Sequence, residues 1–95
     1  MAKLNASQIK TALQTAPDWK KNGSTITRTF PFKDFPMAIK FVNAVAKLAE
    51  KAWHHPDIDI RWNKVTLTLT THDAGGLTAL DVEFVRRVDA VLTRA

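Results

Sequence analysis

The feature that most constrains the fold is a pair of alternating segments between residues 57 and 71. In both segments an apolar residue occupies every second position, which is the period of a half-buried β-strand. The apolar residues are Ile58, Ile60 and Trp62 in the first segment, and Val65, Leu67 and Leu69 in the second. Only Asn63 and Lys64 separate the two segments, and Asn tolerates a positive φ. We therefore expect a hairpin with a two-residue turn.

A turn at these two residues makes a specific prediction about pairing. The opposed pairs would be Trp62 with Val65, Ile60 with Leu67, and Ile58 with Leu69. Each apolar residue then meets another on one face, as register selection requires. This strand position favours the core over a ligand site for Trp62. Continued outward, the register sets His55 opposite His72, and His54 then faces Asp73. All three histidines of the chain converge at one end of this hairpin.

The rest of the chain predicts a second hairpin. Asn22 and Gly23 form a strong short-range hairpin signal, and pairing across them sets Trp19 opposite Ile26. Arg28 interrupts the apolar face of this hairpin, and the sequence offers no account of it.

Three further segments show the apolar spacing of amphipathic helices. The predicted N-terminal cap of the first helix is Asn5, in a capping box with Gln8, or alternatively Ser7. The predicted caps of the other two are Asp34 and Thr78. The second helix should end near Trp53 or His54, because the proline at position 56 disfavours α geometry in the residue before it.

The order helix, hairpin, helix, hairpin, helix points to one fold class. Two hairpins that each have one apolar face need a cover, which three amphipathic helices can supply. We predict an α+β fold, with a four-stranded antiparallel sheet and three helices on one face, in the order α-β-β-α-β-β-α. A chain of 95 residues has room for one core, so residues 1–95 are expected to form a single domain.

Composition excludes several classes of protein. The apolar fraction of 45% is normal for a globular domain, and the absence of cysteine excludes disulfides and thiolate chemistry. No apolar run reaches the length of a membrane span, and no signal-peptide core is present, so we expect a cytoplasmic protein without membrane contact. The net charge of +5 raises the question of nucleic acid, but the basic residues are scattered. We do not expect nucleic acid as a partner.

The converging histidines suggest acid–base chemistry, because imidazole can give or take a proton near neutral pH. Glu50 lies four residues before His54 at the end of a predicted helix, so the two can share one helix face. A metal site is an alternative interpretation. Adjacent histidines point in different directions, however, and the chain lacks the His-x-His and His-x-x-x-His spacings that share a face. Three edge histidines without a task are the third interpretation.

The same residues resemble the pterin-4a-carbinolamine dehydratase family. The resemblance is carried by Glu50-x-x-x-His54-His55-Pro56, by Trp62-Asn-Lys-Val65, and by Thr71-His72 followed by Gly76-Leu-Thr78 and Asp81. It extends upstream to Trp19, to residues 30–35, and to Ala38 and Phe41, so it covers most of the chain. A lone His-His-Pro would be a weak signal, but the combination at this spacing is specific. The resemblance implies the same α+β fold.

The resemblance also implies an activity. Members of this family are hydro-lyases that dehydrate 4a-hydroxytetrahydrobiopterin to quinonoid dihydropterin and water, which supports tetrahydrobiopterin recycling. By resemblance, His54 and His72 form the acid–base pair, His55 mainly binds and orients the pterin, and Glu50 orients His54. The residues that would contact substrate are His55, Asp57, Trp53, Thr71 and Asp81. Trp53 either walls the pocket or simply packs, and Asp81 also suits the start of the last helix. No cofactor and no metal are expected.

The expected partners follow from the same resemblance. They are a pterin substrate, further copies of the chain in a homodimer or homotetramer, and functional coupling to an aromatic amino acid hydroxylase. The alternative is a non-catalytic dimeric binding module, since family members also stabilise dimers of homeodomain transcription factors. A pure binding module would have no reason to keep Glu50, the three histidines and Asp81 together, so an enzyme is favoured.

Overall fold

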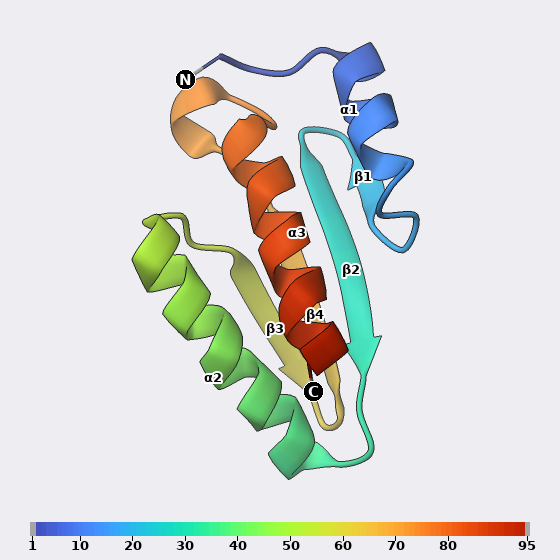
Figure 1. The fold of residues 1–95 in the computed structure, drawn as a ribbon, viewed down its shortest axis with the longest axis vertical. Helices are drawn as coiled ribbons and strands as arrows, with labels where there is room; N and C mark the ends of the chain where they lie inside the picture. The colour runs from blue at the N-terminus through green and yellow to red at the C-terminus, as the bar shows by residue number, and fades with distance from the viewer. Residues whose placement is uncertain (1, 95) are drawn as a thin grey trace.

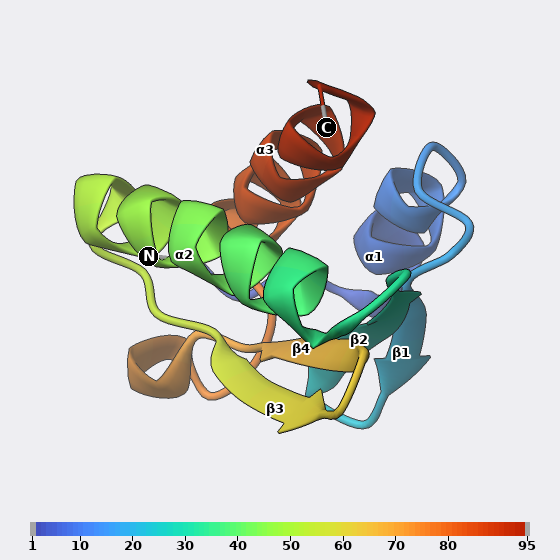
Figure 2. The ribbon, with the colours of Figure 1, turned by 90° about the horizontal axis from the view of Figure 1, so that it is seen from below.

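The computed structural model describes residues 2–94, and the side chains of residues 2–93. The elements are α1 (Ala6–Leu13), β1 (Lys20–Asn22), β2 (Thr25–Pro31), α2 (Phe35–Ala52), β3 (Asp57–Arg61), β4 (Lys64–Leu69), the short 3₁₀ helix η1 (His72–Ala74) and α3 (Ala79–Arg94). The strands form one antiparallel sheet in the order β1-β2-β4-β3. All three α-helices lie on one face of this sheet (Figures 1 and 2). The predicted fold class is confirmed.

The first two helices begin at the predicted caps. Asn5 Oδ1 accepts a hydrogen bond from the Gln8 amide at 2.8 Å, while the Gln8 side chain accepts from the Asn5 amide at 2.9 Å. This reciprocal capping box satisfies two amides that have no partner inside the helix. In the same way, Asp34 accepts from the Met37 amide at 3.0 Å at the start of α2. Within residues 2–94, no helix is long and apolar enough to cross a membrane.

The core lies between the sheet and the helices. Val65, Leu67 and Leu69 of β4 are fully buried, and β4 occupies an inner position in the sheet between β2 and β3. Phe30 of β2 packs against Phe41 of α2, with ring centroids 4.7 Å apart. Full burial of a side chain of this size contributes about 1.5–3 kcal/mol. The alternating sequence pattern thus becomes one apolar sheet face under the helices.

The hairpin of β3 and β4 forms, but its turn lies one residue earlier than predicted. Ile60 pairs with Val65 and Ile58 with Leu67, so the turn residues are Trp62 and Asn63. The apolar residues still share one face, because the pairing shifts by an even number of positions.

Trp62 therefore leaves the core. It adopts φ 52°, and its side chain is 71% exposed, so the prediction of a core position was wrong. A tertiary contact accounts for the shift. Asn63 is held by the chain before α2, since its side-chain amide donates to the Phe32 carbonyl at 2.7 Å and its carbonyl accepts from the Phe32 amide at 2.8 Å.

The first hairpin also turns one residue away from the predicted place. Asn22 pairs with Thr25, so the turn residues are Gly23 and Ser24, and Gly23 takes the left-handed φ of 61°. Trp19 therefore lies before β1 and does not pair with Ile26 as expected. Its indole is 1% exposed and donates through Nε1 to Asp89 Oδ1 of α3 at 3.1 Å. A buried indole N–H needs such a partner, and the partner lies on another element.

Arg28, which the sequence left without an account, belongs to the same contact. Its guanidinium donates to Asp89 Oδ1 at 3.1 Å and lies 3.5 Å from Asp18. It also lies over the Phe30 ring, 4.4 Å from the centroid. Arg28 therefore ties β2 to α3, away from the histidines.

Candidate active site

The end of the sheet where β3 begins and β4 ends holds the predicted site residues. In Figure 1 the end of α2, the start of β3 and the segment around η1 occupy the same end of the molecule. We call this region the histidine corner and define it by Glu50, Trp53, His54, His55, His72 and Asp81. None of the histidines pairs in the sheet, because β3 starts only at Asp57 and β4 ends at Leu69. The predicted pairing of His55 with His72 therefore does not form.

His54 is the buried histidine of the corner, with 9% of its surface exposed. Its amide donates to the Ala49 carbonyl at 3.1 Å, so the residue closes the last turn of α2. Its Nε2 lies 2.6 Å from Asp81 Oδ1. Its ring meets Phe84 of α3 edge-on, with centroids 6.1 Å apart. The residue is thus fixed between α2 and α3.

Asp81 is 0% exposed, and three donors satisfy its carboxylate. Oδ1 receives His54, while Oδ2 accepts from the Thr71 hydroxyl at 2.8 Å and the Thr78 amide at 2.9 Å. The Thr78 hydroxyl accepts from the Leu80 amide at 3.2 Å and lies 2.8 Å from the Thr71 hydroxyl, to which it donates. A buried carboxylate is tolerated only with such complete pairing. Thr71, expected at the substrate, directs its hydroxyl to Asp81.

This network decides where His54 carries its proton. An ionised carboxylate can only accept, and Oδ1 faces Nε2, so Nε2 bears the hydrogen. We assign the tautomer from this network of donors and acceptors. A neutral His54 then keeps Nδ1 as a free acceptor. A carboxylate that orients an imidazole in this way makes the imidazole chemically able to act as a base.

His55 faces outward and has a different carboxylate. Its Nε2 lies 2.6 Å from Glu50 Oε2, and the two side chains are 51% and 69% exposed. The sequence predicted that Glu50 would orient His54, but the structure pairs Glu50 with His55. The i, i+4 argument fails because α2 ends at Ala52, so His54 no longer follows the helix surface. An ion pair this exposed contributes about 0–1 kcal/mol.

Trp53 causes this change of direction. It is the C-cap of α2 and adopts the left-handed conformation, with φ 52° and ψ 43°. A residue with a Cβ atom gives up about 1–2 kcal/mol there, and helices usually end in this way with Gly or Asn. The indole is 77% exposed and meets the His55 ring edge-on, with centroids 5.3 Å apart.

The remaining predicted site residues, Asp57 and His72, are exposed at the surface of the histidine corner. Asp57 is the exposed first residue of β3, and His72 is the exposed first residue of η1. The loop that carries His72 is closed at its base, where the Thr71 amide donates to the Gly76 carbonyl at 3.0 Å. Among the described residues, the His72 side chain makes no hydrogen bond to another side chain.

Sequence reasoning missed the link between Thr71 and Thr78. The Thr-x-x-Asp spacing of residues 78–81 predicted the helix cap, but it did not reveal that a second threonine shares the same carboxylate.

The cavities of the molecule do not identify the site. Two cavities of about 430 Å³ flank α1, one against α3 and the other against the segment around Trp19, and no histidine lines either. We place the candidate site at the histidine corner because the residues that can transfer protons are there. In the part of the chain that the structure describes, no group of three or more His, Asp or Glu side chains could hold a metal ion.

The structure is a four-stranded antiparallel sheet under three helices, with one buried and two exposed histidines at one end. The sequence matches the family model described as "Pterin 4 alpha carbinolamine dehydratase" over residues 2–91. The chain belongs to the pterin-4a-carbinolamine dehydratase family, as its sequence predicted.

Known proteins resemble the chain over nearly its whole length. A protein of Nocardia farcinica named "Putative pterin-4-alpha-carbinolamine dehydratase" is 55% identical over 86 residues, which are 90% of each chain. A crystal structure described as a transcriptional coactivator/pterin dehydratase from Brucella melitensis superposes with a TM-score of 0.90 at 38% identity, covering 94% of this chain and 97% of that one.

A second solved structure is more distant. It is described as a pterin dehydratase-like protein that is a RuBisCO assembly factor in the alpha-carboxysome. Its TM-score is 0.66 at 28% identity, and the match covers 77% of this chain and 87% of that one.

Proposed function

We propose that the protein dehydrates a 4a-hydroxytetrahydropterin, such as 4a-hydroxytetrahydrobiopterin, to the quinonoid dihydropterin and water. Membership of the family suggests the substrate class. One observation carries the proposal, namely that two adjacent histidines are held by two separate carboxylates. His54 is held by buried Asp81, and His55 by exposed Glu50.

The reaction requires two proton transfers. The C4a–O bond breaks, and the hydroxyl group gains a proton and leaves as water. N5 loses its proton as the C4a=N5 bond forms, so one proton is given and one is taken, and no electrons leave the pterin. A positioned acid or base contributes typically about 10²–10⁴-fold to the rate of such a step.

The structure supports a division of roles. His54 and His72 exchange protons with the substrate, while His55 binds and orients it. Asp81 acts through His54, because it keeps the hydrogen on Nε2 and leaves Nδ1 free to accept. Asp57 is exposed at the start of β3 and supplies an acceptor for the 2-amino and N3–H donors of the pterin ring.

The product chemistry gives the enzyme a place in recycling. A quinonoid dihydropterin needs only reduction to regenerate the tetrahydropterin, and an aromatic amino acid hydroxylase is the type of enzyme that would supply the 4a-hydroxy substrate.

Assembly into a homodimer or homotetramer is part of the proposal. Every residue of the edge strand β3 is exposed, including Ile58 at 37% and Ile60 at 38%, and such edges favour pairing with another chain. Light scattering at micromolar concentration should give a multiple of the chain mass. A strictly monomeric mass would remove this part.

A binding module is the second candidate function. The described roles of two similar structures, a transcriptional coactivator and a RuBisCO assembly factor, favour it. A module of this kind would not depend on the histidines, so kinetics distinguish the two candidates.

The test is to generate the 4a-hydroxypterin and follow its ultraviolet decay with and without the protein. We expect a faster decay that survives exhaustive chelation of metals. An unchanged decay rate would refute the dehydratase proposal. Loss of activity on chelation, restored by zinc, would refute histidine acid–base catalysis.

A further inference from the structure

Trp53 combines two features that are unfavourable in the folded chain by itself. Its side chain is 77% exposed, more than any other large hydrophobic side chain that the structure describes. Its backbone is left-handed, at a helix end where Gly or Asn would be relaxed. Residues with a strained backbone cluster at active sites and ligand-binding positions, where the strain is part of the mechanism.

We propose that the Trp53 indole is a stacking platform for the flat pterin ring. The inference rests on the proposed function for its ligand, and it makes Trp53 a binding residue that determines affinity for planar heterocycles.

The orientation of the indole fits this role. Its plane makes an angle of 79° with the His55 ring, and the centroids are 5.3 Å apart. A bicyclic ring that lies flat on the indole therefore stands almost perpendicular to the imidazole. In the proposed complex the indole covers one face of the pterin, whose nitrogen and oxygen atoms lie at the ring edges and remain available for hydrogen bonds to the adjacent imidazole.

The surroundings favour a small ligand over a protein partner. The exposed neighbours of Trp53 in the chain are polar, namely Glu50, Lys51 and His55. A single apolar side chain among charged ones is far smaller than the area that a stable protein interface buries. Stacking of one heterocycle, by contrast, needs only one aromatic side chain.

The decisive variant is Trp53→Asn. Asn suits the left-handed backbone, so the melting temperature should rise by about 2–8 °C. Loss of the platform should raise the Kd for 7,8-dihydrobiopterin, and the KM for the 4a-hydroxy substrate, by roughly 5- to 100-fold. The kcat should change little, because the histidines remain. Trp53→Phe keeps a flat ring and should retain most of the affinity.

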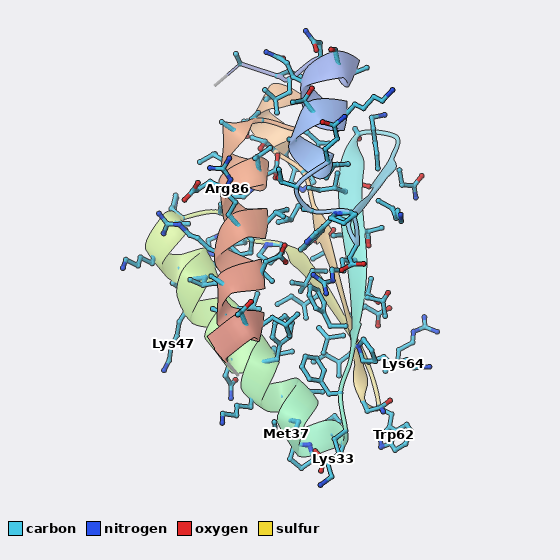
Figure 3. The ribbon with its side chains drawn as sticks, turned by 45° about the vertical axis from the view of Figure 1, so that its right-hand side comes forward. Lys33, Met37, Lys47, Trp62, Lys64 and Arg86 are labelled. Atoms are coloured by element: carbon cyan, nitrogen blue, oxygen red, sulfur yellow. The ribbon has the colours of Figure 1, made fainter. Side chains whose placement is uncertain are left out.

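Trp62 provides a matched control. It is also an exposed tryptophan at φ 52°, but it lies in the turn at the other end of β3, beside Lys64 (Figure 3). Trp62→Asn should therefore raise the melting temperature in the same way and leave the Kd unchanged. Comparison of the two Asn variants therefore separates the effect of relieved backbone strain from the effect of a lost ligand contact.

Each outcome decides the inference. An unchanged Kd in Trp53→Asn, or an equal rise in both variants, overturns the platform, and the dehydratase proposal stands if the unaltered protein turns over. Binding of 7,8-dihydrobiopterin that depends on Trp53, without turnover, supports the platform and refutes the proposed activity. A loss of oligomer mass in Trp53→Asn alone overturns the platform, because it assigns the indole to contacts between copies.

Discussion

His54 and His55 follow one another in the chain, yet the first is 9% exposed and bonded to a fully buried carboxylate, whereas the second is exposed and bonded to a surface carboxylate. The left-handed residue before them makes this divergence possible, because it ends α2 and turns the next side chain inward. The His54 imidazole is therefore fixed through Nε2 to a buried carboxylate, whereas the His55 imidazole is paired with a carboxylate at the surface.

The difference shows how one short segment can place two adjacent imidazoles in two different environments. Asp81, Thr71 and Thr78 hold the buried histidine in place, so the proposed proton transfer would need little reorganisation. The exposed histidine depends on a weak pair that water screens. Substitutions at the buried pair of His54 and Asp81 should thus lower the rate and the stability more than substitutions at the exposed pair of His55 and Glu50.

The largest effect is expected from Asp81→Asn. An amide nitrogen in place of Oδ1 would oppose the Nε2 hydrogen of His54 and favour the wrong tautomer. The rate should fall roughly 10²–10⁴-fold. Stability should fall by about 1–3 kcal/mol, because buried hydrogen bonds become unsatisfied. Steady-state kinetics and thermal melting measure both quantities.

Asp89→Asn is the matched control, since Asp89 also lies on α3 and accepts from Trp19 and Arg28 away from the histidines. It should lower the melting temperature and leave the rate of the folded protein intact. Equal losses of rate in both variants would show that Asp81 matters only for stability.

A smaller effect is expected from His72→Ala, which tests the rim of the corner. His72 is exposed, so stability should change by less than about 1 kcal/mol. Loss of an acid–base partner should lower the rate by about 10²-fold or more.

Leu67→Ala is the opposite case, since Leu67 is 0% exposed in the core. A cavity there should cost about 2–5 kcal/mol, while the folded fraction keeps its chemistry. Nearly full activity in His72→Ala would make that histidine structural and refute the proposed pair.

The smallest effect is expected from Glu50→Gln. The pair with His55 is exposed, so stability should change by less than about 0.5 kcal/mol. The rate should fall less than in Asp81→Asn or His72→Ala, with the loss mainly in KM, because the role proposed for His55 is to orient the pterin. A loss of rate as large as that of Asp81→Asn would contradict the contrast between the buried pair of His54 and Asp81 and the exposed pair of His55 and Glu50.

The sequence by itself determined the features that depend on near neighbours. Asn5 with Gln8, and Asp34 with Met37, cap their helices across three residues, so the capping bonds could be predicted. Alternation of apolar residues predicted the strands and the apolar face of the sheet, and the order of elements led to the fold. The spacing of the histidines and Asp81 led to the family.

Only the tertiary structure decided which partners the side chains chose. A period of two allows any even shift of a hairpin, and the contact of Asn63 with Phe32, 31 residues away, selected the turn. Asp81 lies 27 residues from His54, and Asp89 lies 61 residues from Arg28. Local spacing pointed from Glu50 to His54, but burial joined His54 to Asp81 and left Glu50 to His55. A buried polar group bonds to whatever donor or acceptor the packed elements bring to it, and that choice is made by packing across the chain.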